Sequence, residues 1–147
     1  MQITKVTSNK KQYLPLLLLA DEEEAMIDRY LERGTMYVLE DGDVIAECLV
    51  TDEGDGILEI KSLATLPQFQ HRGYAKALVN FIEAKYKNRF KILQAGTGDS
   101  PATVPFYQKL GFIRSHIIKN FFTDNYSRPI YDGGVLLTDM VYLRKRL

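Results

Sequence analysis

The chain has 147 residues, of which 46% are hydrophobic and 26% are charged, a composition that suits one globular domain with a single core. The 19 Lys and Arg residues balance the 19 Asp and Glu residues, so the formal net charge is zero. A protein without net positive charge has no overall field that would attract nucleic acid or an anionic membrane surface, and we expect neither as a partner.

The first half of the chain alternates strand and helix signals. Pro15 interrupts a helical segment early, and Asp21 stands where the N-cap of a second helix is expected, which Gly34 would end. The Asp41-Gly42 pair, between two β-rich runs, is a strong hairpin signal. We expect strands over residues 2–6, 35–40, 44–51 and 57–66, and helices over residues 10–19 and 21–33.

The second half begins with a change from period 2 to period 3.6 after Pro67, which predicts a long helix up to Tyr86. Pro101 suits the first turn of a further helix that stops at Gly111. The segment 123–134 has the composition of a loop but carries apolar and aromatic side chains, so it should pack on the domain. We expect strands over residues 91–95, 112–122 and 135–143.

Cysteine content and hydropathy indicate where the protein works. The single cysteine, Cys48, cannot form an internal disulfide, and no Cys and His residues have the spacing of a zinc site. The longest aliphatic run, residues 16–20, is far shorter than the ~20 residues that a membrane span requires. We therefore expect a cytoplasmic protein without a metal ion and without a membrane anchor.

The segment Gln70-His71-Arg72-Gly73-Tyr74-Ala75 is the most informative part of the sequence. It lies between a strand and the first turn of the long helix, where backbone N–H groups have no partner inside the helix and the helix dipole is positive. Such a place can bind a pyrophosphate, and Gly73 lets the backbone approach it closely. Arg72 and Lys76 would add positive charge. A glycine that merely completes a turn is the simpler alternative.

A second motif, from Val104 to Phe112, contains Phe106-Tyr107-Gln108-Lys109-Leu110-Gly111-Phe112. With both motifs in order, the sequence resembles the GNAT family of acetyl-CoA-dependent N-acetyltransferases, in particular small bacterial single-domain members, over essentially all of residues 1–147. The resemblance implies an α/β (α+β) fold with a mixed, mostly antiparallel sheet of about 6–7 strands and about 4 flanking helices. It also implies acetyl-CoA as the co-substrate.

The resemblance assigns cofactor-binding residues. The phosphate loop would contribute Gln70, His71, Arg72, Gly73, Tyr74, Ala75 and Lys76. A β-bulge near Ser62 would leave Leu63, Ala64 and Thr65 to contact the cofactor through their main chain. Ser100 stands at the position of an asparagine that contacts the pantetheine arm in many members of the family.

Amine acetylation needs a base for the amine and an acid for the departing thiolate. The resemblance makes Tyr107 the general acid, the alternative being a tyrosine that only packs in the core. It makes Glu59 the general base; the alternative is a strand residue paired with Lys61 or a cross-strand cation. Glu47 is the reserve candidate for the base.

The other reactive side chains are weaker candidates for a catalytic role. His71 suits phosphate binding better than proton transfer, and His116 alternates with apolar residues as a half-buried histidine would. Cys48 is expected to be a core residue. The run Gly96-Thr97-Gly98-Asp99-Ser100 lacks the third glycine of a dinucleotide fingerprint, so we reject a nicotinamide or flavin site and expect it to let two strands diverge.

The sequence favours acetyl transfer to a primary amine of a small molecule, within a ternary complex. Two alternatives stay open: acetylation of a protein or peptide, and a non-catalytic CoA-binding sensor module. The segment 123–134 suits a pocket cover or a dimer surface, so a homodimer also stays open.

Overall fold

The computed structural model describes all residues from Met1 to Leu147. The strands are β1 (Gln2–Lys5), β2 (Thr35–Asp41), β3 (Asp43–Asp52), β4 (Ile57–Thr65), β5 (Ile92–Gly98), β6 (Ile113–Ile118), β7 (Tyr131–Asp132), β8 (Val135–Leu136) and β9 (Met140–Arg146). The helices are η1 (Lys10–Tyr13), α1 (Leu14–Ala20), α2 (Glu24–Ile27), η2 (Pro67–Phe69), α3 (Tyr74–Tyr86), α4 (Val104–Lys109) and α5 (Phe121–Asn125).

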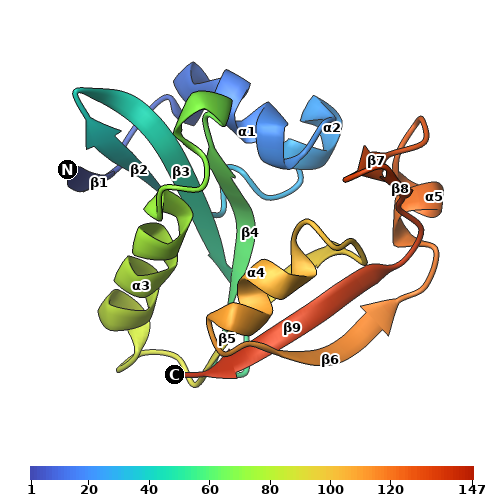
Figure 1. The fold of residues 1–147 in the computed structure, drawn as a ribbon. Coiled ribbons are helices and arrows are strands. Elements are labelled where there is room, and N and C mark those ends of the chain that lie inside the picture. The colour runs from blue at the N-terminus through green and yellow to red at the C-terminus, as the bar shows by residue number, and fades with distance from the viewer.

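Seven strands form one sheet in the order β1-β2-β3-β4-β5-β9-β6, and β7 and β8 form a separate small hairpin (Figure 1). All neighbouring strands in the large sheet are antiparallel except β4 and β5, which are parallel. The expected mixed, mostly antiparallel sheet with flanking helices is therefore confirmed. No helix of the structure is both long and apolar enough to cross a membrane.

Two hydrophobic clusters cover opposite faces of the sheet. The larger cluster includes Leu78, Val79 and Ile82 of α3, which form the apolar stripe predicted for that helix. The smaller cluster packs the N-terminal helices on β2 and β3, with Leu17 of α1 and Leu49 of β3 fully buried. The sheet is thus a rigid layer with different surroundings on its two faces.

The second predicted helix is wrong in its start and its length. Asp21 is the C-cap of α1, the α-helix begins only at Glu24 and ends at Ile27, and the chain continues to Gly34 in turns. The Lys10 ammonium group donates hydrogen bonds to the carbonyl oxygens of Leu31 and Gly34, at 2.9 and 2.8 Å. A distant side chain thus satisfies carbonyl groups that a continuing helix would have used.

The C-terminal third also departs from the expectation. The strand predicted over residues 112–122 ends at Ile118, and α5 follows it. The last strand begins at Met140 rather than at residue 135, because Val135 and Leu136 pair with β7 instead. The helix expected from Pro101 begins at Val104, so Pro105 lies in its first turn, where a missing N–H costs no hydrogen bond.

Candidate active site

Strands β4 and β5 pair over only half of their length. Ile57 to Ile60 pair with Ile92 to Ala95, and no pairing follows. Beyond that point β5 pairs only with β9, and the two halves of the sheet run apart with α4 beside the opening (Figure 1). The edge of β4 that faces β5 is therefore unpaired over residues 61–65, and its backbone groups are free to bind a ligand.

A β-bulge interrupts the pairing of β3 with β4. Leu49 lies opposite Ser62, whereas Val50 lies opposite Ile60, so Lys61 is the extra residue. The family resemblance predicts this break near Ser62 and Leu63, and the structure places it at Lys61, one residue earlier. A bulge reverses which face of the sheet the following side chains occupy.

The predicted phosphate loop has free backbone donors. No hydrogen bond in the structure uses the backbone N–H groups from His71 to Lys76. Gly73 has a φ of 88°, and a Cβ atom there would meet nothing within 4 Å, so the backbone is open to solvent. His71 is also left-handed, with a φ of 62°. These donors at the N-terminus of a 13-residue helix fit a pyrophosphate group.

Side chains around this loop hold it against the sheet. The Gln70 amide donates a hydrogen bond to the carbonyl oxygen of Thr65, at 3.2 Å, and so ties the loop to the end of β4. The Arg72 guanidinium lies over the ring of Phe69, 5.5 Å from its centre. His71 and Lys76 are exposed at the rim.

A cavity of about 630 Å³ lies on the side of the opening that faces the N-terminal helices. Its wall combines residues of α1, α2, β4, β5, α4 and α5. Glu59, Ser62, Leu63 and Tyr107 line it, whereas no residue of the phosphate loop does. The cavity and the loop are therefore separate features, connected along the unpaired edge of β4.

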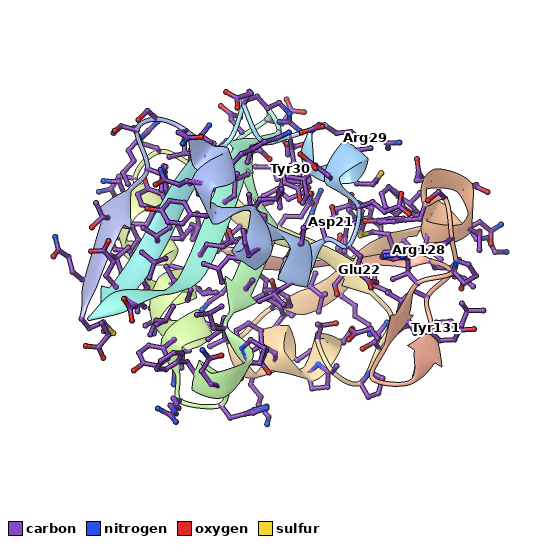
Figure 2. The ribbon with its side chains drawn as sticks, turned by 90° about the horizontal axis from the view of Figure 1, so that it is seen from above. Asp21, Glu22, Arg29, Tyr30, Arg128 and Tyr131 are labelled. Atoms are coloured by element: carbon purple, nitrogen blue, oxygen red, sulfur yellow. The ribbon has the colours of Figure 1, made fainter.

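The segment 121–137, which we call the C-terminal arch, bounds this cavity on the side opposite α1 and α2. The Tyr126 hydroxyl donates to Asp21 at 2.7 Å, the Ser127 hydroxyl donates to Glu23 at 2.7 Å, and the Arg29 guanidinium donates to the side chain of Asn125 at 3.1 Å. Figure 2 shows Asp21 on the N-terminal side lying across from the arch. Elements about 100 residues apart in the chain thus enclose one space.

Asp21 connects the C-terminal arch to the N-terminal helices. Its carboxylate also accepts a hydrogen bond from the Tyr30 hydroxyl at 3.1 Å, and no cation pairs with it. Burial raises the pKa of Asp21 above its ordinary value, although both tyrosine hydroxyls act against this. Glu22, which follows it, is exposed and lines the cavity (Figure 2).

Tyr107 lies on α4 with only 8% of its surface exposed. Its ring packs edge to face against Phe106 and Phe112, with ring centres 5.1 and 5.3 Å away. Burial raises the pKa of its phenol, and the nearby Cys48 and Glu47 add to the shift. The hydroxyl makes no hydrogen bond with the protein, so a protonated donor lies in the cavity wall without a partner.

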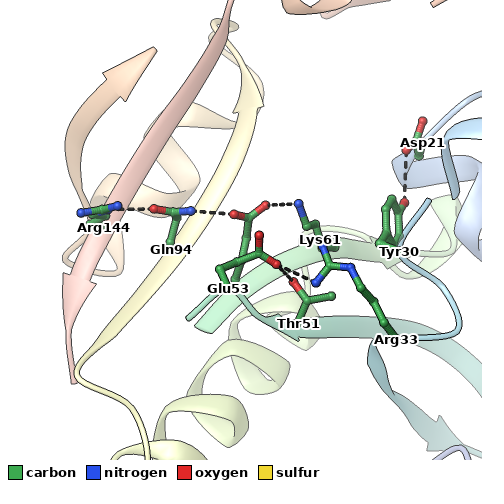
Figure 3. Close-up of polar contacts among 9 residues, drawn as sticks. Asp21, Tyr30, Arg33, Thr51, Glu53, Lys61, Gln94 and Arg144 are labelled. Atoms are coloured by element: carbon green, nitrogen blue, oxygen red, sulfur yellow. Dashed lines mark hydrogen bonds and ion pairs between the residues drawn. The ribbon is translucent and has the colours of Figure 1, made fainter. Parts of the chain in front are cut away.

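Glu59 belongs to a polar chain that runs from Lys61 through Gln94 to Arg144, across the part of β4, β5 and β9 that is still paired; Figure 3 labels these three partners. Its Oε1 accepts a hydrogen bond from Gln94 at 2.6 Å, and its Oε2 pairs with the Lys61 ammonium group at 2.8 Å. Gln94 in turn accepts a hydrogen bond from Arg144 at 2.7 Å. The pairing with Lys61, which is the alternative to a catalytic role for Glu59, is therefore present, and both carboxylate oxygens are engaged.

Glu47 is fully buried on β3 and has no cation near it. Its Oε1 accepts a hydrogen bond from the Ser62 hydroxyl at 2.5 Å, and its Oε2 has no partner. Burial raises the pKa of Glu47 to about 8, against which the Ser62 hydrogen bond acts. The sequence names Glu47 only as a reserve and Ser62 only as the place of the expected bulge, because their contact depends on a strand register that no local pattern of residues records.

The Ser100 hydroxyl already has hydrogen-bond partners within the protein. It donates to Asp132 at 2.8 Å and accepts from the backbone N–H of Ala102 at 3.0 Å, and Ser100 does not line the cavity. Its contact with a cofactor stays a prediction. Gly96 and Gly98 do line the cavity, and side chains there would collide with Met140 and Leu137.

The remaining reactive residues lie outside the cavity wall. His116 is exposed on β6 rather than half-buried, and its ring stacks on Tyr142 with centres 4.6 Å apart. Cys48 is fully buried as expected, and burial raises the pKa of its thiol well above the ordinary value. No group of three or more His, Cys, Asp or Glu side chains is arranged to hold a metal ion.

Comparisons with known proteins agree with this geometry. Residues 32–114 match the family model described as an acetyltransferase (GNAT) domain. The chain is 36% identical to an uncharacterized N-acetyltransferase of Bacillus subtilis, YvbK, over 87% of this chain and 84% of the relative.

Two solved structures of GNAT-type enzymes align over nearly the whole chain. A GNAT family acetyltransferase from Elizabethkingia anophelis with acetyl-CoA bound has a TM-score of 0.93 and 36% identity, covering 99% of this chain and 97% of that one. A Bacillus subtilis acetyltransferase in complex with CoA has a TM-score of 0.89 and 32% identity, covering 99% and 98%. The chain belongs to the GNAT family and is an N-acetyltransferase.

Proposed function

We propose that residues 1–147 act as a single domain that transfers the acetyl group of acetyl-CoA to a primary amine of a small molecule, within a ternary complex. The observation that carries this proposal is the continuity of three features. Unbonded amides at the start of α3 can hold a pyrophosphate, the unpaired edge of β4 can hold the arm that follows it, and the cavity beyond can hold an acceptor.

The cofactor-binding residues take distinct roles in this proposal. The amides from His71 to Lys76 bind the pyrophosphate, with the Arg72 and Lys76 charges at the rim. The backbone groups that β4 turns toward β5 beyond Ile60 bind along the arm, which is the role predicted for Leu63, Ala64 and Thr65. When bound, acetyl-CoA supplies an acetyl group activated as a thioester, and the protein binds, orients and moves protons around it.

We propose that Tyr107 donates the proton that the departing thiolate requires. Its hydroxyl is unpaired in the cavity wall, and the raised pKa keeps it protonated across the physiological range. Positioned acids of this kind contribute about 10²- to 10⁴-fold to a rate.

Glu59 is the base predicted from the sequence, with Glu47 as the reserve, and both stay candidates for accepting the proton of the amine. Glu59 lines the cavity, but one of its oxygens already accepts a hydrogen bond from Gln94 and the other forms an ion pair with Lys61. A carboxylate has about four lone-pair sites, so a proton can still be accepted there.

A small acceptor is supported by the C-terminal arch. The bonds of Tyr126 and Ser127 to the N-terminal helices bridge one side of the cavity, which leaves less room for an extended peptide. A concave space lined by aromatic side chains and a few polar groups is typical of small-molecule sites.

The test is to incubate the protein with acetyl-CoA and a broad panel of amines while thiol release is followed. We expect turnover with a subset of small amines and little with peptides. Tight acetyl-CoA binding without thiol release for any amine would instead favour a CoA-binding sensor module.

A further inference from the structure

The Glu47–Ser62 pair connects a fully buried carboxylate with the wall of the acceptor cavity. Ser62 lines the cavity, and its hydroxyl donates to Glu47 Oε1 at 2.5 Å. Glu47 Oε2 has no hydrogen-bond partner although it is completely buried. Unsatisfied carboxylate oxygens are costly in a protein interior, so this one requires an explanation other than stability.

The β-bulge at Lys61 is what creates this pair. Without the extra residue, Ser62 would lie opposite Cys48, whose side chain belongs to the cluster that packs on α3. With it, Ser62 lies opposite Leu49, on the face covered by α1, and diagonal to Glu47. The chain therefore uses an irregularity of its sheet to join a cavity hydroxyl to a buried carboxylate.

The groups around Glu47 would leave its proton affinity high. The ionisable groups that interact with it are the Cys48 thiol beside it on β3, the Tyr30 phenol from the turn after α2, and the Tyr107 phenol from α4. None of them is a cation, α1 carries no charged residue, and Val38 faces it from β2. A carboxylate in such surroundings binds a proton readily near neutral pH.

We propose that Ser62 and Glu47 form a proton relay that accepts the proton of the acceptor's ammonium group. An N–H bond of the ammonium breaks and its proton moves to Ser62 Oγ, while the hydroxyl proton of Ser62 moves to Glu47 Oε1. The free amine then forms the C–N bond as the thioester C–S bond breaks, Tyr107 gives its hydroxyl proton to the CoA sulfur, and a second nitrogen proton replaces it on Tyr107. Glu47 finally returns its proton to water. The relay rests on the function proposed above.

The relay has a distinctive pH dependence. It works only while Glu47 is ionised, and burial raises the pKa of Glu47 to about 8. The value of kcat/KM should therefore rise with pH and level off near pH 8. Without the relay, the rise should continue toward the pKa of the amine itself, about 10.

The experiment compares pH profiles of kcat/KM for the parent, Glu47→Gln, Ser62→Ala and Glu59→Gln, using an amine found active in the panel. We expect Glu47→Gln and Ser62→Ala to lose about 10²-fold at neutral pH and to shift the ascending limb upward, with unchanged acetyl-CoA affinity. Glu32→Gln, an exposed glutamate whose side chain makes no hydrogen bond or ion pair in the structure, is the matched control.

A second measurement does not depend on turnover. Infrared difference spectra of the parent should show a protonated carboxyl group that titrates near pH 8, and Glu47→Gln should lack it. If the ascending limb of the kcat/KM pH profile is the same in Glu47→Gln and Ser62→Ala as in the parent, the relay is overturned. If that limb shifts in Glu59→Gln alone, the relay is overturned too, while the acetyltransferase function stays intact. An absence of thiol release from every amine with the parent would overturn both.

Discussion

The Tyr107 hydroxyl is a protonated donor with no partner in the protein. If it stabilises mainly the transition state, Tyr107→Phe should lower kcat by about 10²-fold and leave acetyl-CoA affinity unchanged, because the packed ring remains. Steady-state kinetics together with calorimetry measure both quantities. Tyr13→Phe removes a hydroxyl that makes no hydrogen bond and lies outside the cavity wall, and it serves as the control. Full turnover in Tyr107→Phe would leave Tyr107 with a packing role only.

Glu47 also predicts how stability depends on pH. Its pKa is raised from 4.5 to about 8 in the folded protein, so the folded state binds this proton more tightly than the unfolded state does. The free energy of unfolding should therefore fall as pH rises from about 4.5 to about 8, by a few kcal/mol from this group. Urea unfolding across this range should show a shallower fall for Glu47→Gln. Parallel curves for variant and parent would contradict the raised pKa.

At the level of elements, a single substitution can test whether the loop before α3 binds the pyrophosphate. Gly73 has a φ of 88°, and a valine there would place its side chain over the amides that we propose bind the pyrophosphate. Calorimetry on Gly73→Val should show most of the acetyl-CoA affinity lost. Gly54→Val is matched, because Gly54 has a φ of 84° and equally open surroundings in the turn between β3 and β4. Equal loss in both variants would point to backbone strain instead.

The C-terminal arch should determine acceptor binding without affecting acetyl-CoA. Tyr126 and Tyr131 both line the cavity, and Tyr126 also bonds to Asp21, whereas the phosphate loop lies outside it. We expect Tyr126→Ala with Tyr131→Ala to raise the KM for the amine several-fold at constant acetyl-CoA affinity. Kinetics with both substrates, and sedimentation for the oligomeric state, provide the measurement. If the KM and the mass both match the parent, the arch is only a connection between strands.

At the scale of the whole molecule, the proposed acetyl-CoA site lies between two halves of the sheet. These halves separate after Ile60 of β4 and Ala95 of β5. A ligand that binds only the folded chain should raise its unfolding free energy, by about 2.7 kcal/mol at about 100 times Kd. Thermal unfolding of the parent should therefore shift upward with acetyl-CoA, and that of Gly73→Val much less. An equal shift in both would place the ligand elsewhere.

Much of the architecture could be predicted because its signals are local. The Asp41-Gly42 hairpin, the apolar stripe of α3 and the end of α4 at Gly111 each depend on residues within a few positions of one another. The two motifs at Gly73 and Tyr107 likewise need only their own neighbours in the chain. Patterns formed by residues this close together in the chain can be recognised without any knowledge of the fold.

The sequence by itself thus determined most of the element types and the family, and it predicted the phosphate loop. Only the tertiary structure decided that α2 ends at Ile27, that the bulge at Lys61 turns Ser62 toward Glu47, and that the C-terminal arch closes on Asp21. Each depends on groups between 15 and 105 residues apart. Such contacts form only when the folded chain brings distant segments together, and no local pattern of residues records them.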